Sequence, residues 1–370
     1  MSRKNDALLA PAVEPVATSL PAIDWASIGK SAPLPVAQAA RQASDPLPKA
    51  DVVVITWTSA EWSALDHVFA NSGSARAPGL GAWDVDWFPY ARKTGDFKSD
   101  PIGGPLWGSF RVVTVATLTG TVRVLLFHSD AHLQYEPYIA GLEAMVQNIL
   151  ADAKPLQLYS IGTAGGGALN QALGDTVVTN GAQLEAGKPP NNASSANGQT
   201  FTCTGWYPPT TLYSAAQKLM FPLSNVVTMP ELQMLFSRFA QKYSVSSLKL
   251  TDFLNAPLQP ANLGTPKVHS LKGLPLNTSC NFAMAPGTGS KTFAAFEEDD
   301  AAVAQAALKA GINFAFIRNV SDTVVPDHST TGTVIPDPIR EDWAGLLYDR
   351  YGLFTASNGA LATWAAIAAG

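Results

Sequence analysis

A continuous run of apolar, mostly β-branched side chains at residues 52–55 (VVVI) constrains the fold of this chain more than any other feature. Because no polar residue alternates with the apolar ones, the run indicates a strand that is buried on both faces, as in a sheet covered by helices on both sides. The sequence SAEWSALDHVF follows after a short loop and predicts a helix. The regular part of the chain therefore begins as strand, loop and helix.

The same alternation continues along the chain. RVVTVATL and VRVLLFHS predict paired strands, EPYIAGLEAMVQNILADA predicts a helix, and LQLYSI predicts a buried strand that runs into the glycine-rich segment GTAGGG. Further on we expect a helix over residues 297–310 ended by Gly311, a strand at INFAFI, a polar loop, and a last helix from about 340 to 369. Strands that alternate with helices in this way predict an α/β fold around a largely parallel or mixed sheet.

Composition divides the 370 residues into an arm and one domain. Residues 1–49 are rich in Ala, Pro and Ser with few large apolar side chains, which predicts a flexible N-terminal arm or one that lies over a neighbouring molecule. Residues 50–370 are expected to form a single domain, with insertions at about 79–108 and 186–275. Within the second insertion, MPELQMLFSRFAQKY (229–243) predicts a helix.

Charge and cysteine usage exclude several classes of partner. The net charge of −5 and the absence of a dense Lys/Arg run argue against a nucleic-acid partner. The two cysteines, Cys203 and Cys280, form no zinc or disulfide pattern, which fits a reducing cytoplasm. We recognise no export signal, and no stretch reaches the roughly 18 apolar residues of a membrane span, so no membrane partner is expected.

Polar residues gather where the predicted strands end. Glu61 follows the first strand, Thr163 follows LQLYSI, FEEDD precedes helix 297–310, and Ser321-Asp322 follows INFAFIRNV. Ligands of open α/β sheets bind at the carboxyl ends of the strands, so we expect these residues to converge on one rim.

Five segments resemble the superfamily of nucleoside phosphorylases and nucleosidases, most closely the methylthioadenosine/S-adenosylhomocysteine nucleosidases. They are VVVITWTSAEWSAL, SIGTAGGGALNQALGDTVVTNGA, LNTSCNFAM, FEEDDAAVAQAALKAGINFAFIRNVSD and the alanine-rich C-terminal helix. The resemblance covers roughly residues 50–370 apart from the two insertions. It implies a three-layer α/β/α fold with a central mixed sheet, and homo-oligomers in which a neighbour closes the pocket.

The resemblance also gives each position a role. Glu61 falls on the carboxylate that activates the attacking water, and Asp322, after Ser321, on the acid that protonates the leaving base. Asp299 falls on the carboxylate that holds the ribose hydroxyls, 23 positions before Asp322. The other positions implied to bind substrate are Thr163 and Gly165 beside the sugar, Phe282 stacked on the base, and Ser321.

Two departures from the family pattern bear on these roles. Nucleosidases usually have methionine then glutamate where this chain has Glu298 then Asp299, so Glu298 stays an alternative ribose ligand. Phosphorylases hold phosphate with an arginine at the position of Ser160, and no arginine occurs in TWTSAEW either. Without a fixed cation a phosphate dianion has no partner to offset its desolvation, which favours water as the nucleophile.

Ordinary structural explanations exist for the same residues. Acidic residues are favoured in the first turn of any helix, and on this reading Glu297 and Asp300 are the common acidic start of helix 297–310. Asp322 would cap a turn with Ser321, Glu61 would be solvated, and Phe282 would be a core residue. The sequence HSDAH places His128, Asp130 and His132 on one face of a strand, as metal ligands can be, but a pocket-lining loop or a hydrogen-bond cluster is the favoured interpretation.

The residues therefore predict an enzyme, an N-glycosyl hydrolase that acts on a purine nucleoside or a 5′-modified adenosine and needs no metal or organic cofactor. Breaking an N-glycosidic bond builds positive charge on the sugar and negative charge on the base, so carboxylates near the sugar and a proton donor at the base both favour the transition state. The alternatives are a phosphate-dependent nucleoside phosphorylase and a non-catalytic nucleoside-binding relative.

Overall fold

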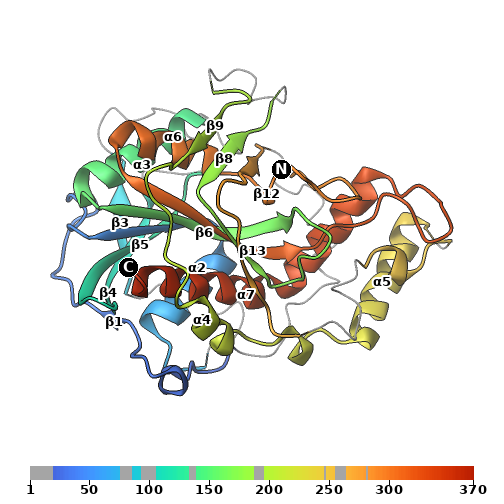
Figure 1. Ribbon diagram of the computed structural model, residues 1–370, viewed down its shortest axis with the longest axis horizontal. Helices are drawn as coiled ribbons and strands as arrows, with labels where there is room; N and C mark the ends of the chain where they lie inside the picture. The colour runs from blue at the N-terminus through green and yellow to red at the C-terminus, as the bar shows by residue number, and fades with distance from the viewer. Residues whose placement is uncertain are drawn as a thin grey trace.

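The run at residues 52–55 forms the middle of a mixed sheet covered by helices on both faces (Figure 1). In this computed structural model the described residues are 20–75, 86–92, 106–132, 139–186, 196–245, 247–254, 264–280 and 282–370. The predicted α/β fold with a central mixed sheet is confirmed.

The strands of the described residues have the following bounds: β1 Leu34–Pro35, β2 Val52–Thr56, β3 Phe88–Ala91, β4 Leu106–Ala116, β5 Thr121–Ser129, β6 Gln157–Gly166, β7 Thr176–Thr179, β8 Gly181–Leu184, β9 Thr200–Thr202, β10 Val268–Ser270, β11 Leu276–Thr278, β12 Ala295–Glu297 and β13 Asn313–Asp322. The α-helices are α2 Ser59–Ala70, α3 Ile139–Ala153, α4 Tyr213–Leu219, α5 Met229–Tyr243, α6 Asp300–Ala310 and α7 Asp337–Ala368. The short 3₁₀-helices are η1 Trp25–Ile28, η4 Leu223–Asn225 and η5 Leu250–Asp252.

Parallel pairing in the centre of the sheet brings three strand ends together. β2 pairs in parallel with β5 on one side and with β6 on the other, and β6 pairs in parallel with β13. β4 and β5 are antiparallel, as the sequence predicts for RVVTVATL and VRVLLFHS. The short strand β12 runs antiparallel to the end of β6, so that β6 has a partner on each side at its carboxyl end.

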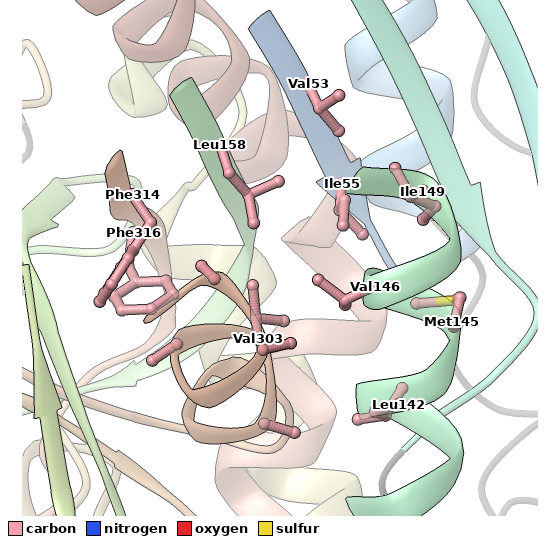
Figure 2. Packing of buried hydrophobic residues seen from close by; sticks show 14 of the residues in the cluster. Val53, Ile55, Leu142, Met145, Val146, Ile149, Leu158, Val303, Phe314 and Phe316 are labelled. Carbon is pink, nitrogen blue, oxygen red and sulfur yellow. The ribbon is translucent and has the colours of Figure 1, made fainter. Parts of the chain in front are cut away.

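Alternate residues of β2 contribute to two separate cores. Val53 and Ile55 pack under α3 and α6, whereas Val52 and Val54 pack under α2 and α7. Figure 2 shows the first of these cores, with side chains of β2, β6 and β13 against those of α3 and Val303 of α6. Each fully buried aliphatic or aromatic side chain of this kind contributes about 1.5–3 kcal/mol of transfer free energy, so the two cores fix the strands from both sides.

A third apolar cluster joins the 186–275 insertion to the C-terminal helix. The predicted helix at 229–243 is present as α5, and its Phe236 and Phe239 pack edge-on against Trp343 of α7, with ring centroids 6.0 and 5.4 Å apart. The predicted last helix is α7, which runs along the same face of the sheet as α2 and α4 (Figure 1).

Residues 20–49, which composition assigned to an N-terminal arm, lie against the folded chain. Trp25 of η1 is buried and meets Trp364 of α7 with ring centroids 4.7 Å apart. Strand β1 pairs with β4, and Leu47 is part of the core under α3. Residues 1–19 lie outside the described residues.

Two boundaries differ from the predicted ones, and both concern the candidate site. The sequence predicts a strand at LQLYSI, before the glycine-rich segment GTAGGG, and a polar loop after INFAFI. In the structure β6 continues to Gly166 and β13 to Asp322, because the two strands stay paired up to Gly165. The helix expected from residue 297 begins at Asp300, because Glu297 ends strand β12.

Candidate functional site

The candidate site residues lie around the carboxyl end of β6. Gly165 is in register with Asp322 of β13 on one side and with Phe296 of β12 on the other. Glu61 approaches the same end from the first turn of α2, which follows β2. The expected convergence of Glu61, Thr163, the FEEDD segment and Asp322 on one rim follows from this pairing.

Glu61 is a buried carboxylate held by hydrogen-bond donors. Its Oε2 accepts from the backbone N–H groups of Trp57 and Thr58 at 3.0 and 2.9 Å. Its Oε1 accepts from both the N–H and the Oγ1–H of Thr163, each at 2.7 Å. These donors suit a carboxylate, which only accepts. The ordinary alternative, a solvated Glu61, is wrong, because the exposed fraction of this residue is 3%.

A guanidinium approaches Glu61 across Gly162. A Cβ atom at Gly162 would lie 2.6 Å from Nη1 of Arg318 and 2.8 Å from Oε1 of Glu61. Only a residue without a side chain fits between the two groups.

Arg318 is buried on β13 and binds a cluster of polar side chains. Its Nε donates to Oδ2 of Asp300 at 2.7 Å and its Nη2 to Oδ1 at 2.5 Å, a bidentate pair. Nη2 also lies 3.3 Å from Oε2 of Glu297 and 3.3 Å from Oγ of Ser160. Burial opposes the charge of Arg318, but Asp300 and Glu297 outweigh it and raise its pKa above the ordinary value. The site therefore contains a permanent, neutralised cation.

The prediction that no fixed cation lies near Ser160 is wrong. The sequence predicts no fixed cation at Ser160, yet Arg318 reaches the Ser160 hydroxyl from the neighbouring strand. Ser160 Oγ also donates to Asp300 and accepts from Nε1 of Trp57. The carboxylate of Asp300 already forms a bidentate pair with the guanidinium that a phosphate would need.

The four acidic residues of FEEDD make different contacts. Glu297 and Asp300 were interpreted as the acidic start of a helix; Asp300 is in the first turn of α6, but both side chains are also buried and pair with Arg318. Glu297 also takes over the capping of α6, since its Oε2 accepts from the N–H groups of Asp299 and Asp300 at 2.6 and 2.9 Å. The next N–H group of the helix, that of Ala301, donates to Oγ1 of Thr278 at 3.0 Å, and the Thr278 hydroxyl in turn donates to Oε1 of Glu297.

Crowding of carboxyl groups changes the protonation of Glu297. Burial, and then the neighbouring Asp300, raise the pKa of Glu297 to about 8, although Arg318 acts in the opposite direction. Burial also raises the pKa of Asp300, opposed by Arg318. One cation cannot compensate every buried carboxylate nearby, so Glu297 binds a proton near neutral pH.

Asp299 and Glu298, the two candidate ribose ligands, face a histidine. Nε2 of His132 lies 3.4 Å from Oδ2 of Asp299 and 3.6 Å from Oε2 of Glu298. Asp299 is the more buried of the two, with 3% of its side chain exposed against 23% for Glu298. Burial lowers the pKa of His132, while Glu298 and Glu61 oppose the shift.

Asp322 lies in the sheet beside Gly165. Ser321 Oγ donates to Oδ1 of Asp322 at 2.8 Å. A Cβ at Gly165 would lie 2.9 Å from Oδ2 of Asp322 and 3.9 Å from the carbonyl oxygen of Ala283. The half-buried Phe282 is next to Ala283, so the segment that carries it passes this end of β6.

The histidines of HSDAH are separated in the structure. The His128 ring stacks on Trp62 with centroids 4.0 Å apart, and burial lowers its pKa to about 4. Its Nδ1 is 3.7 Å from Asp130, whereas His132 turns toward Asp299. Within the described part of the chain no group of three His, Cys, Asp or Glu side chains is suited to hold a metal ion.

Sequence reasoning missed Arg318, Asp300 and the contacts of Ser160 and His132. A signal for Arg318 was available, because an arginine inside the apolar strand INFAFIRNV requires a buried carboxylate partner, and FEEDD supplies one. Ser160 and His132 had no comparable signal, since their partners come from distant segments.

No protein-family model and no curated protein matches the chain. Solved structures with a similar fold include the 5′-methylthioadenosine/S-adenosylhomocysteine nucleosidase of Neisseria meningitidis, with 14% identity and a TM-score of 0.44 over 86% of this chain and 98% of that chain. The S-adenosylhomocysteine nucleosidase of Streptococcus pyogenes has 15% identity and a TM-score of 0.44 over 87% and 98% of the two chains. The futalosine hydrolase of Helicobacter pylori has 10% identity and a TM-score of 0.45 over 85% and 96%. The first two bear the name of the nucleosidases that the sequence motifs resemble.

None of the described helices combines the length and the apolar character needed to cross a membrane.

Proposed function

We propose that the chain is a nucleosidase that hydrolyses the N-glycosidic bond of a purine nucleoside or a 5′-modified adenosine and releases the free base and the sugar. The observation that carries the proposal is the arrangement of buried carboxylates around one strand end. Glu61 is bound to Thr163, Asp322 adjoins Gly165, and Asp299 is the N-cap residue of the helix that follows the paired strand β12.

In the proposed reaction Glu61 takes a proton from a water molecule, and the water oxygen forms a bond to C1′ of the sugar. The bond between C1′ and the base nitrogen breaks, and Asp322 transfers its proton to the departing purine at N7. Asp299, with Glu298 as the alternative, holds the ribose hydroxyls, and Phe282 stacks on the base. Carboxylates near the sugar stabilise the positive charge that develops there.

The fixed hydrogen bonds of Glu61 support its role as the base. Five N–H and O–H donors hold the carboxylate, the fifth being the Thr56 hydroxyl, and Arg318 adds positive charge on its far side across Gly162. A base whose position is set before the substrate arrives needs little rearrangement in the transition state.

Phosphorolysis is the second candidate, and the bidentate pairing of Arg318 with the carboxylate of Asp300 argues against it. The test is incubation of the protein with a panel of nucleosides and nucleotides, with and without phosphate, followed by chromatography of base and sugar products. We expect base and free sugar without phosphate. Release that requires phosphate and yields sugar 1-phosphate would establish the phosphorylase, and no release from any member would leave a non-catalytic binding protein.

We also propose that the protein acts as a homo-oligomer in the cytoplasm, with a neighbouring copy closing the pocket. Light scattering coupled to size-exclusion chromatography measures the mass in solution against the 39.0 kDa of one chain. Activity that persists in a monomer would contradict a pocket completed by a neighbour.

A further inference from the structure

The first turn of α6 has an unusual cap. Asp299 occupies the N-cap position, where an aspartate ordinarily accepts a backbone N–H, yet its side chain makes no cap hydrogen bond. Glu297 and Thr278 accept the N–H groups of this turn instead. The carboxylate of Asp299 is therefore not required by its own helix.

The imidazole of His132 faces that carboxylate. Its Nε2 is 3.4 Å from Asp299 Oδ2 and 3.6 Å from Glu298 Oε2. Since carboxylates only accept hydrogen bonds, the matching tautomer carries its hydrogen on Nε2. His132 can then orient the side chain of Asp299 by an N–H directed at Oδ2.

The imidazole itself is held in place by its surroundings. Its ring meets the edge of Trp57 at a centroid distance of 6.5 Å and an angle of 82°. Trp57 is fixed in turn by the hydrogen bond from its Nε1 to Ser160 Oγ at 3.2 Å. The histidine therefore lies between the ring of a hydrogen-bonded tryptophan and the Asp299 carboxylate.

We infer that His132 is the positioning residue of the sugar-binding carboxylate Asp299, and that through it the site selects nucleosides with an intact ribose diol over 2′-deoxynucleosides. This inference rests on the proposed nucleosidase function. A site built to hydrogen-bond a hydroxyl discriminates strongly against an analogue that lacks it, provided that the acceptor is held in the correct orientation.

Two conservative substitutions separate this role from a structural one. His132→Gln keeps an N–H donor at about the reach of Nε2, whereas His132→Asn places its amide near the position of Nδ1 and falls short of Asp299. For adenosine we expect His132→Asn to raise KM about tenfold with a smaller change in kcat, because the contact between the His132 N–H and the Asp299 carboxylate is lost. For 2′-deoxyadenosine KM should change little, and His132→Gln should recover most of the selectivity.

The steady-state constants of wild type and both variants with the two substrates provide the test, with thermal melting to verify folding. The inference is supported if His132→Asn loses much of the preference for adenosine over 2′-deoxyadenosine while His132→Gln keeps most of it. Equal changes for both substrates, or no change, overturn it. If the substituted chains do not fold, His132→Phe, which keeps a ring against Trp57 without the N–H, gives the same comparison. Absence of base release by the wild type overturns the proposed function itself, which distinguishes the two failures.

Discussion

At the scale of single residues, the site combines groups that are hard to bury. A guanidinium, several carboxylates and two hydroxyls lie within one network, and each contact satisfies a group that would otherwise lose its hydration. Glycines supply the space: Gly162 lies between Arg318 and Glu61, and Gly165 lies beside Asp322. The charged groups can therefore approach β6 closely because these two positions carry no side chain.

Asp322→Asn tests the proton donor. If Asp322 protonates the leaving base, the amide should lower kcat by at least about 10²-fold, because it cannot give up a proton. Single-turnover base release measures the effect, and Asp349→Asn on the exposed side of α7 is the matched control. Near-normal turnover in a folded Asp322→Asn variant would remove Asp322 from the mechanism.

Gly162→Ala tests the approach of Arg318 to Glu61. The added methyl would lie 2.6 Å from Nη1 and 2.8 Å from Oε1, so one of the two groups must move. We expect a loss of about 1–3 kcal/mol in the free energy of unfolding together with a fall in kcat. Gly120→Ala, where a Cβ meets nothing within 4 Å, should leave both unchanged. Unaltered kcat in Gly162→Ala would show that the position of Glu61 is not critical.

At the scale of elements, the start of α6 is capped from outside the helix. Thr278 of β11 and Glu297 of β12 accept three N–H groups of its first turn, while the acidic residues Asp299 and Asp300 face other partners. Pairing between β11 and β12, which puts Thr278 opposite Glu297, makes this cap possible. The helix position is thereby tied to the sheet that carries the site.

Thr278→Val tests this cap. Valine has nearly the same shape but leaves the Ala301 N–H and a Glu297 oxygen without their partner, which should cost about 1–3 kcal/mol of stability. Urea unfolding measures the change, and Thr200→Val on the exposed surface of β9 should stay within about 0.5 kcal/mol of wild type. Equal stability of the two variants would contradict a capping role for Thr278.

At the scale of the whole molecule, two buried groups give stability opposite dependences on pH. Burial lowers the pKa of His128 from 6.5 to about 4, so the folded state binds fewer protons there than the unfolded chain between these values, and stability rises with pH in that window. The pKa of Glu297 rises from 4.5 to about 8, so its contribution is fully present below pH 4.5 and is lost as pH approaches 8.

Between pH 6.5 and 8 the effect of Glu297 outweighs that of His128, because His128 is neutral in the folded state there and loses the rest of its charge in the unfolded chain by about pH 7.5. We expect the melting temperature to fall across this window, and Glu297→Gln, which mimics the protonated acid, to remove most of the fall. Calorimetry at several pH values and constant ionic strength measures the melting temperature. Glu143→Gln, which removes a carboxylate from a surface ion pair with Lys309, is the control. A melting temperature that rises from pH 6.5 to 8 would mean that Glu297 is ionised in the folded state.

The sequence by itself determined the local features of this protein. The run at 52–55, the helix at 229–243 and the long C-terminal helix follow from apolar pattern, and the α/β fold follows from their order. The positions of Glu61, Asp299 and Asp322 near strand ends could be read from the chain because each adjoins an element that periodicity identifies. Such features depend on neighbours within a few residues.

Only the tertiary structure decided how the charges pair. FEEDD contains four acidic residues that look alike in sequence, yet Glu297 caps a helix and pairs with Arg318, Asp300 binds Arg318, and the other two face His132. Their partners are 18 to more than 160 positions away along the chain, at Arg318 and His132. Electrostatic pairing depends on distance in space and on exclusion of water, and both are set by the folding of β6, β12 and β13 into one sheet edge.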